Sequence, residues 1–211
     1  MDLDKLMGIP ARNTISRPIA QMHEFYLTGE IGPAEEYLEW FDTIRHSSET
    51  DIVKIYINSG GGNLFTAIQF LRVLTDCKAT VIVSVEGMCA SAATLIMLCA
   101  DSYEISMHTV FMFHNYSGGT IGKGGEMYDN VVHNRAWSNK LLHDIYADFL
   151  TEDEIDKIMD NKDLWMDADE VLLRLNKRSE KFEADAAAEV EAESKPEDDK
   201  SQLELDYGQI L

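Results

Sequence analysis

One serine stands out in the sequence because small residues surround it at the end of an apolar run. Ser91 lies in Gly-Met-Cys-Ala-Ser-Ala-Ala, residues 87–93, which follows the strand-like run Ala79–Val85 and precedes an apolar stretch that continues to Ala100. Small neighbours at a strand-to-helix corner expose a hydroxyl where backbone N–H groups converge, and they let a carbonyl approach closely. The segment indicates a serine nucleophile for acyl transfer. A buried helix whose serine bonds to its own turn is the alternative.

A serine nucleophile needs a general base, and the chain has six histidines. His114 ends the apolar run of residues 110–113 and is followed by a glycine-rich loop. This pattern places it at the end of a strand, where α/β sheets gather functional groups, and favours it as the base. The other histidines lie on a polar helical stretch, near element ends or in a turn: His23, His46, His108, His133 and His143.

A glycine run, Asn58-Ser-Gly-Gly-Gly62, separates a strand-like segment from a helical pattern. Its backbone N–H groups could hold a phosphate, or an oxyanion at the helix N-terminus, and a plain tight turn is the third interpretation. The phosphate-loop interpretation fails because no Gly-Lys-Ser/Thr sequence follows.

The segments that would position these groups alternate between strand and helix. Hydrophobic patterns predict strands over Phe25–Ile31, Ile52–Ile57, Ala79–Val85 and Val110–Phe113. They predict helices over residues 33–47, 64–74, 90–100 and 126–150. Capping signals predict two more helices, after Thr151 and after Asp167. Such alternation implies an α/β fold with largely parallel strands and crossover helices.

Composition limits the function. The formal net charge of −20 over 211 residues argues against nucleic-acid binding, which needs Lys and Arg at the phosphates. No stretch has the length and apolar character of a membrane span, and the N-terminus lacks a signal-peptide pattern. Three cysteines, Cys77, Cys89 and Cys99, lack metal-ligand spacing and indicate reduced thiols. We therefore expect a cytoplasmic protein without a metal or cofactor.

The two ends of the chain differ from its middle. Residues 1–22 contain two prolines and little periodicity, which predicts an N-terminal arm. From Glu180 onward there are eleven acidic and three basic residues, an alanine run and few aromatics, which predicts disorder. We therefore expect one domain over residues 23–178 and a disordered acidic tail over 179–211.

Four segments, in order, resemble the proteolytic subunit of Clp protease, in the larger family that includes the crotonase-fold hydratases. Residues 57–62 resemble its Asn-Ser-Pro-Gly-Gly turn, and residues 87–93 resemble its nucleophile segment, Gly-x-Ala-Ala-Ser-Met-Ala. Residues 113–119 resemble Ile-His-Gln-Pro-x-Gly-Gly. Residues 162–170 resemble Arg-Asp-x-Phe-Met-Ser-Ala-x-Glu, which holds the family's aspartate. The resemblance covers roughly residues 25–172.

Some residues depart from the family's pattern. Gly60 stands where the family has proline, which loosens the turn. Cys89 replaces an alanine and Ala92 a methionine, which alters packing near Ser91 without removing a reactive group. After the aspartate segment, the family's Gly-Leu-Ile-Asp is absent.

The resemblance implies a Clp/crotonase-like fold of repeated β-β-α units with a protruding helix. It also implies a catalytic triad, in which Ser91 is the nucleophile, His114 the base and Asp163 the group that orients the imidazole. The N–H groups of Gly62 and Ala92 would form the oxyanion hole. An extended peptide would bind along a further set of residues: Gly61, Ser117, Gly118 and Gly119.

The function that the resemblance implies is a serine endopeptidase that cleaves polypeptides inside an oligomeric chamber of stacked rings, meshed by the helix that begins at Glu126. Candidate partners are an ATP-dependent unfoldase or phage capsid proteins, and a phage-encoded chain would act in the host cytoplasm. Two alternatives stay open. One is a catalytically silent or capsid-assembly protein on the same fold. The other is a crotonase-type acyl-CoA enzyme, although this acidic chain lacks a basic site for the adenine phosphates.

Overall fold

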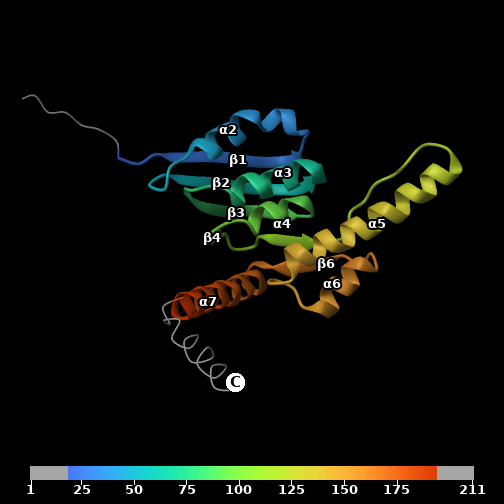
Figure 1. The fold of residues 1–211 in the computed structure, drawn as a ribbon. Coiled ribbons are helices and arrows are strands. Elements are labelled where there is room, and N and C mark those ends of the chain that lie inside the picture. Colours follow the sequence, from blue (N-terminus) through green and yellow to red (C-terminus); the bar gives the residue numbers. More distant parts are fainter. Residues whose placement is uncertain (1–18, 194–211) are drawn as a thin grey trace, which may run out of the picture. The chain divides into compact units, whose positions relative to one another are not determined.

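The computed structural model describes residues 19–193, which fall into two compact units divided between Glu104 and Ile105 (Figure 1). Both units combine strands with helices, so the predicted α/β class is confirmed. Within the described residues, no helix has the length and apolar character needed to cross a membrane.

The N-terminal unit is built on parallel strands joined by crossover helices. Within residues 19–104, β1 (Met22–Ile31), β2 (Ile52–Gly62) and β3 (Thr80–Ala90) lie in that order, and β4 (Ser102–Ile105) pairs with β3. The connections are the short 3-10 helix η1 (Ala34–Tyr37) with α2 (Leu38–His46), then α3 (Leu64–Thr75), and after β3 the helix α4 (Ala92–Met97). The predicted parallel alternation is therefore confirmed in this unit.

Alternation along the strands places one face of this sheet in the core. On β2, Val53, Ile55 and Ile57 are fully buried, and α4 packs against β2 and β3. Aromatic rings fill the space beneath the helices, with the ring centroids of Phe41 and Phe70 4.7 Å apart. This packed core lies against β2 and β3, the two strands whose ends lead into the glycine run and Ser91.

Both central strands are longer than their apolar runs predict. β2 continues through the glycine run to Gly62, and β3 continues through Gly87 to Ala90, so the predicted ends of these strands are wrong. The cause is backbone pairing: Gly62 pairs with Ile31 of β1, and Cys89 pairs with Ser59 of β2. Hydrogen bonds between main chains extend a strand without leaving a mark in the hydrophobic pattern.

The strand pairing is irregular beside these ends. The β1–β2 register shifts between Thr28 and Glu30, and the β2–β3 register shifts between Ile57 and Ser59. Bulges of this kind bend a strand and re-aim its residues, and they are common next to active sites.

The C-terminal unit contains an antiparallel pair of strands. β5 (Val110–Phe113) runs against β6 (Leu164–Asp167), with Phe113 opposite Leu164. Its helices are α5 (Gly124–Tyr146), α6 (Glu152–Met159) and α7 (Ala168–Glu193). Both predicted caps are present, because Thr151 accepts a hydrogen bond from the Glu154 N–H and Asp167 accepts one from the Glu170 N–H. Strand β6 was not predicted, because Leu-Trp-Met-Asp, unlike Val-Phe-Met-Phe of β5, has no β-branched residue and ends on an acid.

The acidic segment that begins at Glu180 is helical as far as Glu193, so the prediction of disorder is wrong over these residues. Alanine and glutamate are strong helix formers, and Lys181 forms an ion pair with Asp148. The helical propensity of the segment therefore outweighs its charge. Residues 194–211 of the predicted tail and 1–18 of the predicted arm lie outside the described residues, and Met22 of that arm already belongs to β1.

A bidentate ion pair between Arg174 and Glu154 joins α6 to α7. The guanidinium of Arg174 contacts both carboxylate oxygens of Glu154, at 2.7 and 2.8 Å, and also Glu170 at 2.7 Å. The side chains of Arg174 and Glu154 are only 19% and 17% exposed. Hydrogen bonds from Arg174 lower the pKa of Glu154 from 4.5 to about 2.

We expect this pair to make the C-terminal unit sensitive to acid. Because the pKa of Glu154 is lower in the folded chain, its stabilising contribution is complete above pH 4.5 and is lost as the pH falls toward 2. Glu154→Gln should lower the free energy of unfolding at pH 7 by about 2 kcal/mol, less than the full pKa difference gives, because water reaches both side chains. Urea unfolding between pH 7 and pH 3 measures this. Asp156→Asn, at an exposed acid on the same helix, is the control. If Glu154→Gln unfolds in acid just as the wild type does, the acid sensitivity does not come from the Glu154–Arg174 pair.

Candidate active site

Ser91 lies at the junction of β3 and α4 in an unusual backbone conformation, with φ of 54° and ψ of −129°. Such a conformation costs a residue with a Cβ about 1–3 kcal/mol, so the surrounding structure must enforce it. The Ser91 carbonyl accepts hydrogen bonds from the N–H and the Oγ1 of Thr94, at 3.0 and 2.7 Å, which close the turn. Its own hydroxyl does not cap α4. The predicted serine thus lies on a sharp strand-to-helix turn of the kind that exposes a nucleophile.

Gly61, near the end of β2, lies directly against this turn. Its φ is 94°, and a Cβ added to it would lie 2.6 Å from the Cβ of Ser91 and 2.8 Å from the carbonyl oxygen of Ala90. Real Cβ atoms essentially never come this close to other heavy atoms, so the approach requires glycine on both steric and conformational grounds. The glycine run of β2 therefore packs directly against the turn that contains Ser91.

The two residues expected to form an oxyanion hole belong to the same cluster. Gly62 follows Gly61 directly and has φ of 144°, and an added Cβ would lie 2.4 Å from the carbonyl oxygen of Ile31 on β1. Ala92 is the first residue of α4, where N–H groups have no partner within the helix. Gly61 thus lies against Ser91 and the Ala92 N–H, whereas Gly62 adjoins Gly61 in sequence and its own nearest atoms belong to β1.

Asn58 holds the bulge beside this cluster, a role that the sequence did not indicate. Its side-chain oxygen accepts a hydrogen bond of 3.2 Å from the Met88 N–H. A Cβ on Gly87 would lie 2.7 Å from that oxygen, so glycine is needed for the contact. The Asn58 side chain thereby joins β2 to the segment that leads into Ser91. Asparagine in a glycine run is a common turn residue, so its type alone gave no signal.

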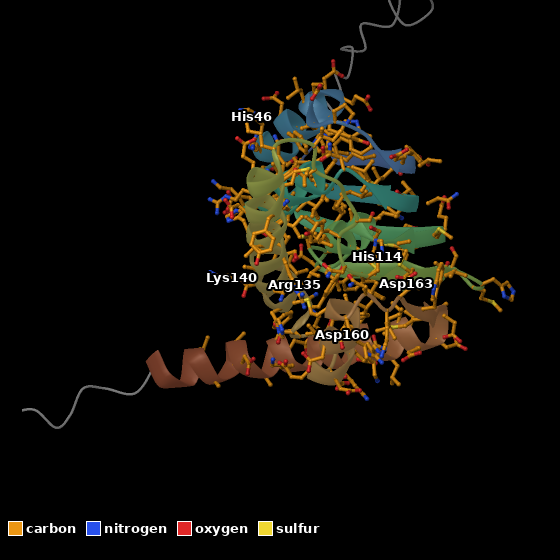
Figure 2. The ribbon with its side chains drawn as sticks, turned by 90° about the vertical axis from the view of Figure 1, so that its right-hand side faces the viewer. His46, His114, Arg135, Lys140, Asp160 and Asp163 are labelled. Atoms are coloured by element: carbon orange, nitrogen blue, oxygen red, sulfur yellow. The ribbon has the colours of Figure 1, made fainter. Side chains whose placement is uncertain are left out.

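His114 and Asp163 come together in the C-terminal unit. His114 directly follows β5 and Asp163 directly precedes β6, so the antiparallel pairing of Phe113 with Leu164 brings the two side by side. The Nδ1 atom of His114 is 3.8 Å from the Oδ1 atom of Asp163, and Figure 2 shows their side chains beside one another. The histidine is 23% exposed and the aspartate 53%. This distance is within ion-pair range and longer than a hydrogen bond, and it places the carboxylate beside the Nδ1 side of the ring.

The loop after His114 contains the remaining predicted site residues, which are exposed: Ser117, Gly118 and Gly119. Its beginning is held by the buried Asn115, whose amide nitrogen donates a 3.3 Å hydrogen bond to the Asn161 side chain. The Asn115 oxygen accepts a second bond, of 2.9 Å, from the Tyr116 N–H. The loop thus starts from a fixed point and presents backbone groups to solvent. Its role in peptide binding stays a prediction.

Cys89 is close to Ser91 in sequence but is not suited to act as a nucleophile. It is fully buried, and burial raises the pKa of its thiol, so the reactive thiolate is not formed near neutral pH. Cys77 and Cys99 are also free thiols, and each bonds to a backbone carbonyl. Over residues 19–193, His, Cys, Asp and Glu side chains form no group of three or more that could hold a metal ion.

These features define an α/β protein with a serine on a strand-to-helix turn packed against a glycine run. The family model of the Clp protease matches residues 30–173, and the chain therefore belongs to the Clp protease family.

Two known proteins illustrate the relationship. The ATP-dependent Clp protease proteolytic subunit 1 of Salinibacter ruber is 25% identical over 122 residues, which are 56% of this chain and 52% of the relative. The chain thus spans about half the length of the curated relative that it matches. A ClpP1 mutant from Listeria monocytogenes superposes with a TM-score of 0.56 at 23% identity, over 72% of this chain and 86% of that one. This likeness confirms the predicted Clp/crotonase-like fold.

Proposed function

We propose that the chain is a serine endopeptidase of the Clp type, with Ser91 as its nucleophile. The observation that carries the proposal is the turn at Ser91, which holds a positive φ against Gly61 at a distance that excludes any side chain. A positive φ in a residue with a Cβ costs free energy and persists only where the surrounding structure enforces it. Residues in such conformations concentrate at functional sites. Membership of the Clp protease family points to the same chemistry.

In the proposed reaction, the Ser91 oxygen attacks a peptide carbonyl and gives its proton to Nε2 of His114. Asp163 faces the other ring nitrogen, Nδ1, and stabilises the imidazolium that forms. The N–H groups of Gly62 and Ala92 donate hydrogen bonds to the negatively charged oxygen of the tetrahedral intermediate. The protonated histidine then gives its proton to the leaving amine, and water releases the acyl group by the same steps. Uniting the Ser91 cluster with the His114–Asp163 pair in one site is part of this proposal.

The proposed substrates are extended polypeptides. Gly61 and the loop Ser117–Gly119 would hold a peptide through backbone hydrogen bonds, as an added strand. Gly118 and Gly119 are exposed and suit this mode, because no side chain keeps the peptide at a distance. Gly61 is buried and its N–H bonds to the Ser59 hydroxyl, so that N–H is not available to the peptide. Such binding is tolerant of sequence, which fits a peptidase that degrades unfolded chains.

A serine-reactive aryl phosphonate, followed by mass spectrometry, tests the nucleophile directly. We expect one adduct, on Ser91, because its hydroxyl is activated by the histidine and its adduct is held by the oxyanion donors. Ser91→Ala should carry no adduct, and His114→Ala should react at least about a hundredfold more slowly. His133→Ala, at an exposed histidine of α5, serves as the control and should react at the wild-type rate. A wild-type chain that stays unmodified at Ser91 would contradict the proposal. That result is expected both for a catalytically silent protein and for an acyl-CoA enzyme.

We further propose that the chain forms a homo-oligomer through the first half of α5. Residues 124–136 are exposed apart from Met127, and the apolar side chains of Tyr128, Val131 and Val132 are 70%, 53% and 50% exposed. Neighbouring apolar side chains on an exposed helix are typical of an interface. Stacked rings that enclose a chamber are the assembly we propose. An unfoldase or capsid-protein partner and a cytoplasmic location stay predictions.

Light scattering tests this assembly. We expect a mass several times that of the 23.8 kDa chain, and a clear fall in mass for the double variant Val131→Glu, Val132→Glu, because paired like charges would have to be buried. Leu173→Glu, at an apolar residue of α7 that is 55% exposed, is the control and should keep the wild-type mass. A wild-type mass equal to one chain at micromolar concentration would contradict the assembly.

A further inference from the structure

The end of β2 must hold one backbone conformation although its own residues do little to select it. Gly60, Gly61 and Gly62 follow one another, and glycine has the least restricted backbone of any residue. Gly61 nevertheless keeps a φ of 94° in close contact with the turn at Ser91. Some neighbouring group must select this conformation from the many that three glycines allow.

Ser59 provides that group. Its side chain is only 1% exposed, which is unusual for a serine. The Ser59 hydroxyl donates a hydrogen bond of 2.6 Å to the carbonyl of Gly29 on β1, and it accepts one of 3.1 Å from the Gly61 N–H. One hydroxyl therefore joins β1 to the glycine run. Because the bond from Gly61 is buried, it restrains the backbone more strongly than the same bond at the surface would, and the bond to Gly29 is partly buried.

The position of this bridge in the sheet shows why it is needed. The β1–β2 register shifts between Thr28 and Glu30, and Gly29, inside that shift, has φ of 85°. A bulge interrupts the ladder of backbone hydrogen bonds that fixes an ordinary strand. The ladder resumes at the pairs Glu30–Gly61 and Ile31–Gly62, and the Ser59 hydroxyl spans the interruption that precedes them.

We infer that Ser59 is a positioning residue, whose buried hydroxyl bridges Gly29 and Gly61 and thereby holds the Gly62 N–H in place for the oxyanion formed at Ser91. This inference rests on the proposed function. Ser59 acts through backbone groups, since both of its hydrogen-bond partners are backbone atoms and its side chain is buried. Its loss should therefore affect the rate of the chemical step more than the binding of substrate.

Ser59→Ala removes the bridge and keeps the volume nearly constant. We expect kcat on an unstructured fluorogenic peptide to fall roughly 10- to 100-fold, since a misplaced oxyanion donor costs that much, while KM changes by less than about twofold. Labelling of Ser91 by the aryl phosphonate should slow by a similar factor. Hydrogen–deuterium exchange, read by mass spectrometry on peptides that span residues 59–63, should become faster.

Ser47→Ala is the matched control. Ser47 is also buried, at 5% exposure, and its hydroxyl donates a 2.9 Å bond to the carbonyl of Thr43 at the end of α2. Its loss should lower the melting temperature about as much as Ser59→Ala does and leave kcat at the wild-type value. Ser59→Cys keeps a weaker hydrogen-bonding group in the same volume, so its kcat should lie between wild type and Ser59→Ala. It also provides the comparison if the alanine variant does not fold.

The outcomes separate this inference from the proposed function. Unchanged exchange at residues 59–63, or an unchanged kcat despite faster exchange, overturns the positioning role while the peptidase assignment stands. Equal losses of kcat in Ser59→Ala and Ser47→Ala also overturn it, because a general loss of stability would then be the cause. A wild-type chain that neither cleaves peptide nor reacts with the phosphonate overturns the proposed function, and the positioning role falls with it.

Discussion

Ser91→Ala should lower kcat on an unstructured peptide by roughly 10⁴- to 10⁶-fold, the largest effect expected of any single substitution. The variant loses the attacking oxygen and keeps every backbone group around it. Because alanine also has a Cβ, the positive φ and its cost remain, so the melting temperature should stay close to that of the wild type. Hydrolysis of a fluorogenic peptide and thermal unfolding of the same samples measure the two properties.

Ser91→Gly separates the backbone cost from the chemistry. Glycine adopts a φ of 54° readily, so this variant should be as inactive as Ser91→Ala and more stable by about 1 kcal/mol. Greater stability without activity is the expected sign of a residue kept in a costly conformation for its function. Peptide hydrolysis by either variant at the wild-type rate would show that another residue is the nucleophile.

Gly61→Ala should have the second-largest effect, because it damages both the stability and the geometry of the site. The new Cβ would lie 2.6 Å from the Cβ of Ser91 and 2.8 Å from the carbonyl oxygen of Ala90, and the backbone would still need a φ of 94°. We expect a loss of about 2–4 kcal/mol in the free energy of unfolding. We also expect a fall of at least about a hundredfold in kcat, since the turn at Ser91 must move.

Gly29→Ala is the matched control for stability. Gly29 also has a positive φ, 85°, but no described atom lies within 4 Å of the Cβ that would be added. This variant should therefore lose only about 1 kcal/mol, the conformational cost without the clash. Urea unfolding compares the two. Equal losses in the two variants would mean that Gly61 is needed for its φ alone and that its contact with the Ser91 turn is not tight.

The residues to which we assign chemistry could be recognised in the sequence to different degrees. Ser91 could be recognised because a lone hydroxyl among small side chains, at the end of an apolar strand, is typical of an exposed nucleophile. His114 could be recognised because it ends another apolar strand. Asp163 is one of many acids and came only from the family resemblance. Gly61 looked like part of a turn, since the sequence does not show that another segment packs within contact distance of it.

The errors in the predicted elements have one physical origin. β2 and β3 extend beyond their apolar runs because each pairs with a neighbouring strand, and such pairing depends on backbone atoms that every residue has. α7 extends beyond Glu180 because alanine-rich helical propensity outweighed an acidic composition typical of disorder. Local side-chain patterns therefore predicted where elements occur, and interactions with neighbours determined where they end.

The short β5–β6 ladder also determines which charge stands beside His114. Phe113 pairs with Leu164, so the residue that precedes Leu164, an anion, meets the histidine. A shift of β6 by one residue would bring Lys162 to that place, so that a cation would replace the carboxylate beside the ring. Insertions or deletions in the connection between α6 and β6 could thus silence the chain without changing Ser91, His114 or Asp163. For the function that we propose, the register of β6 therefore matters as well as the identity of the three side chains.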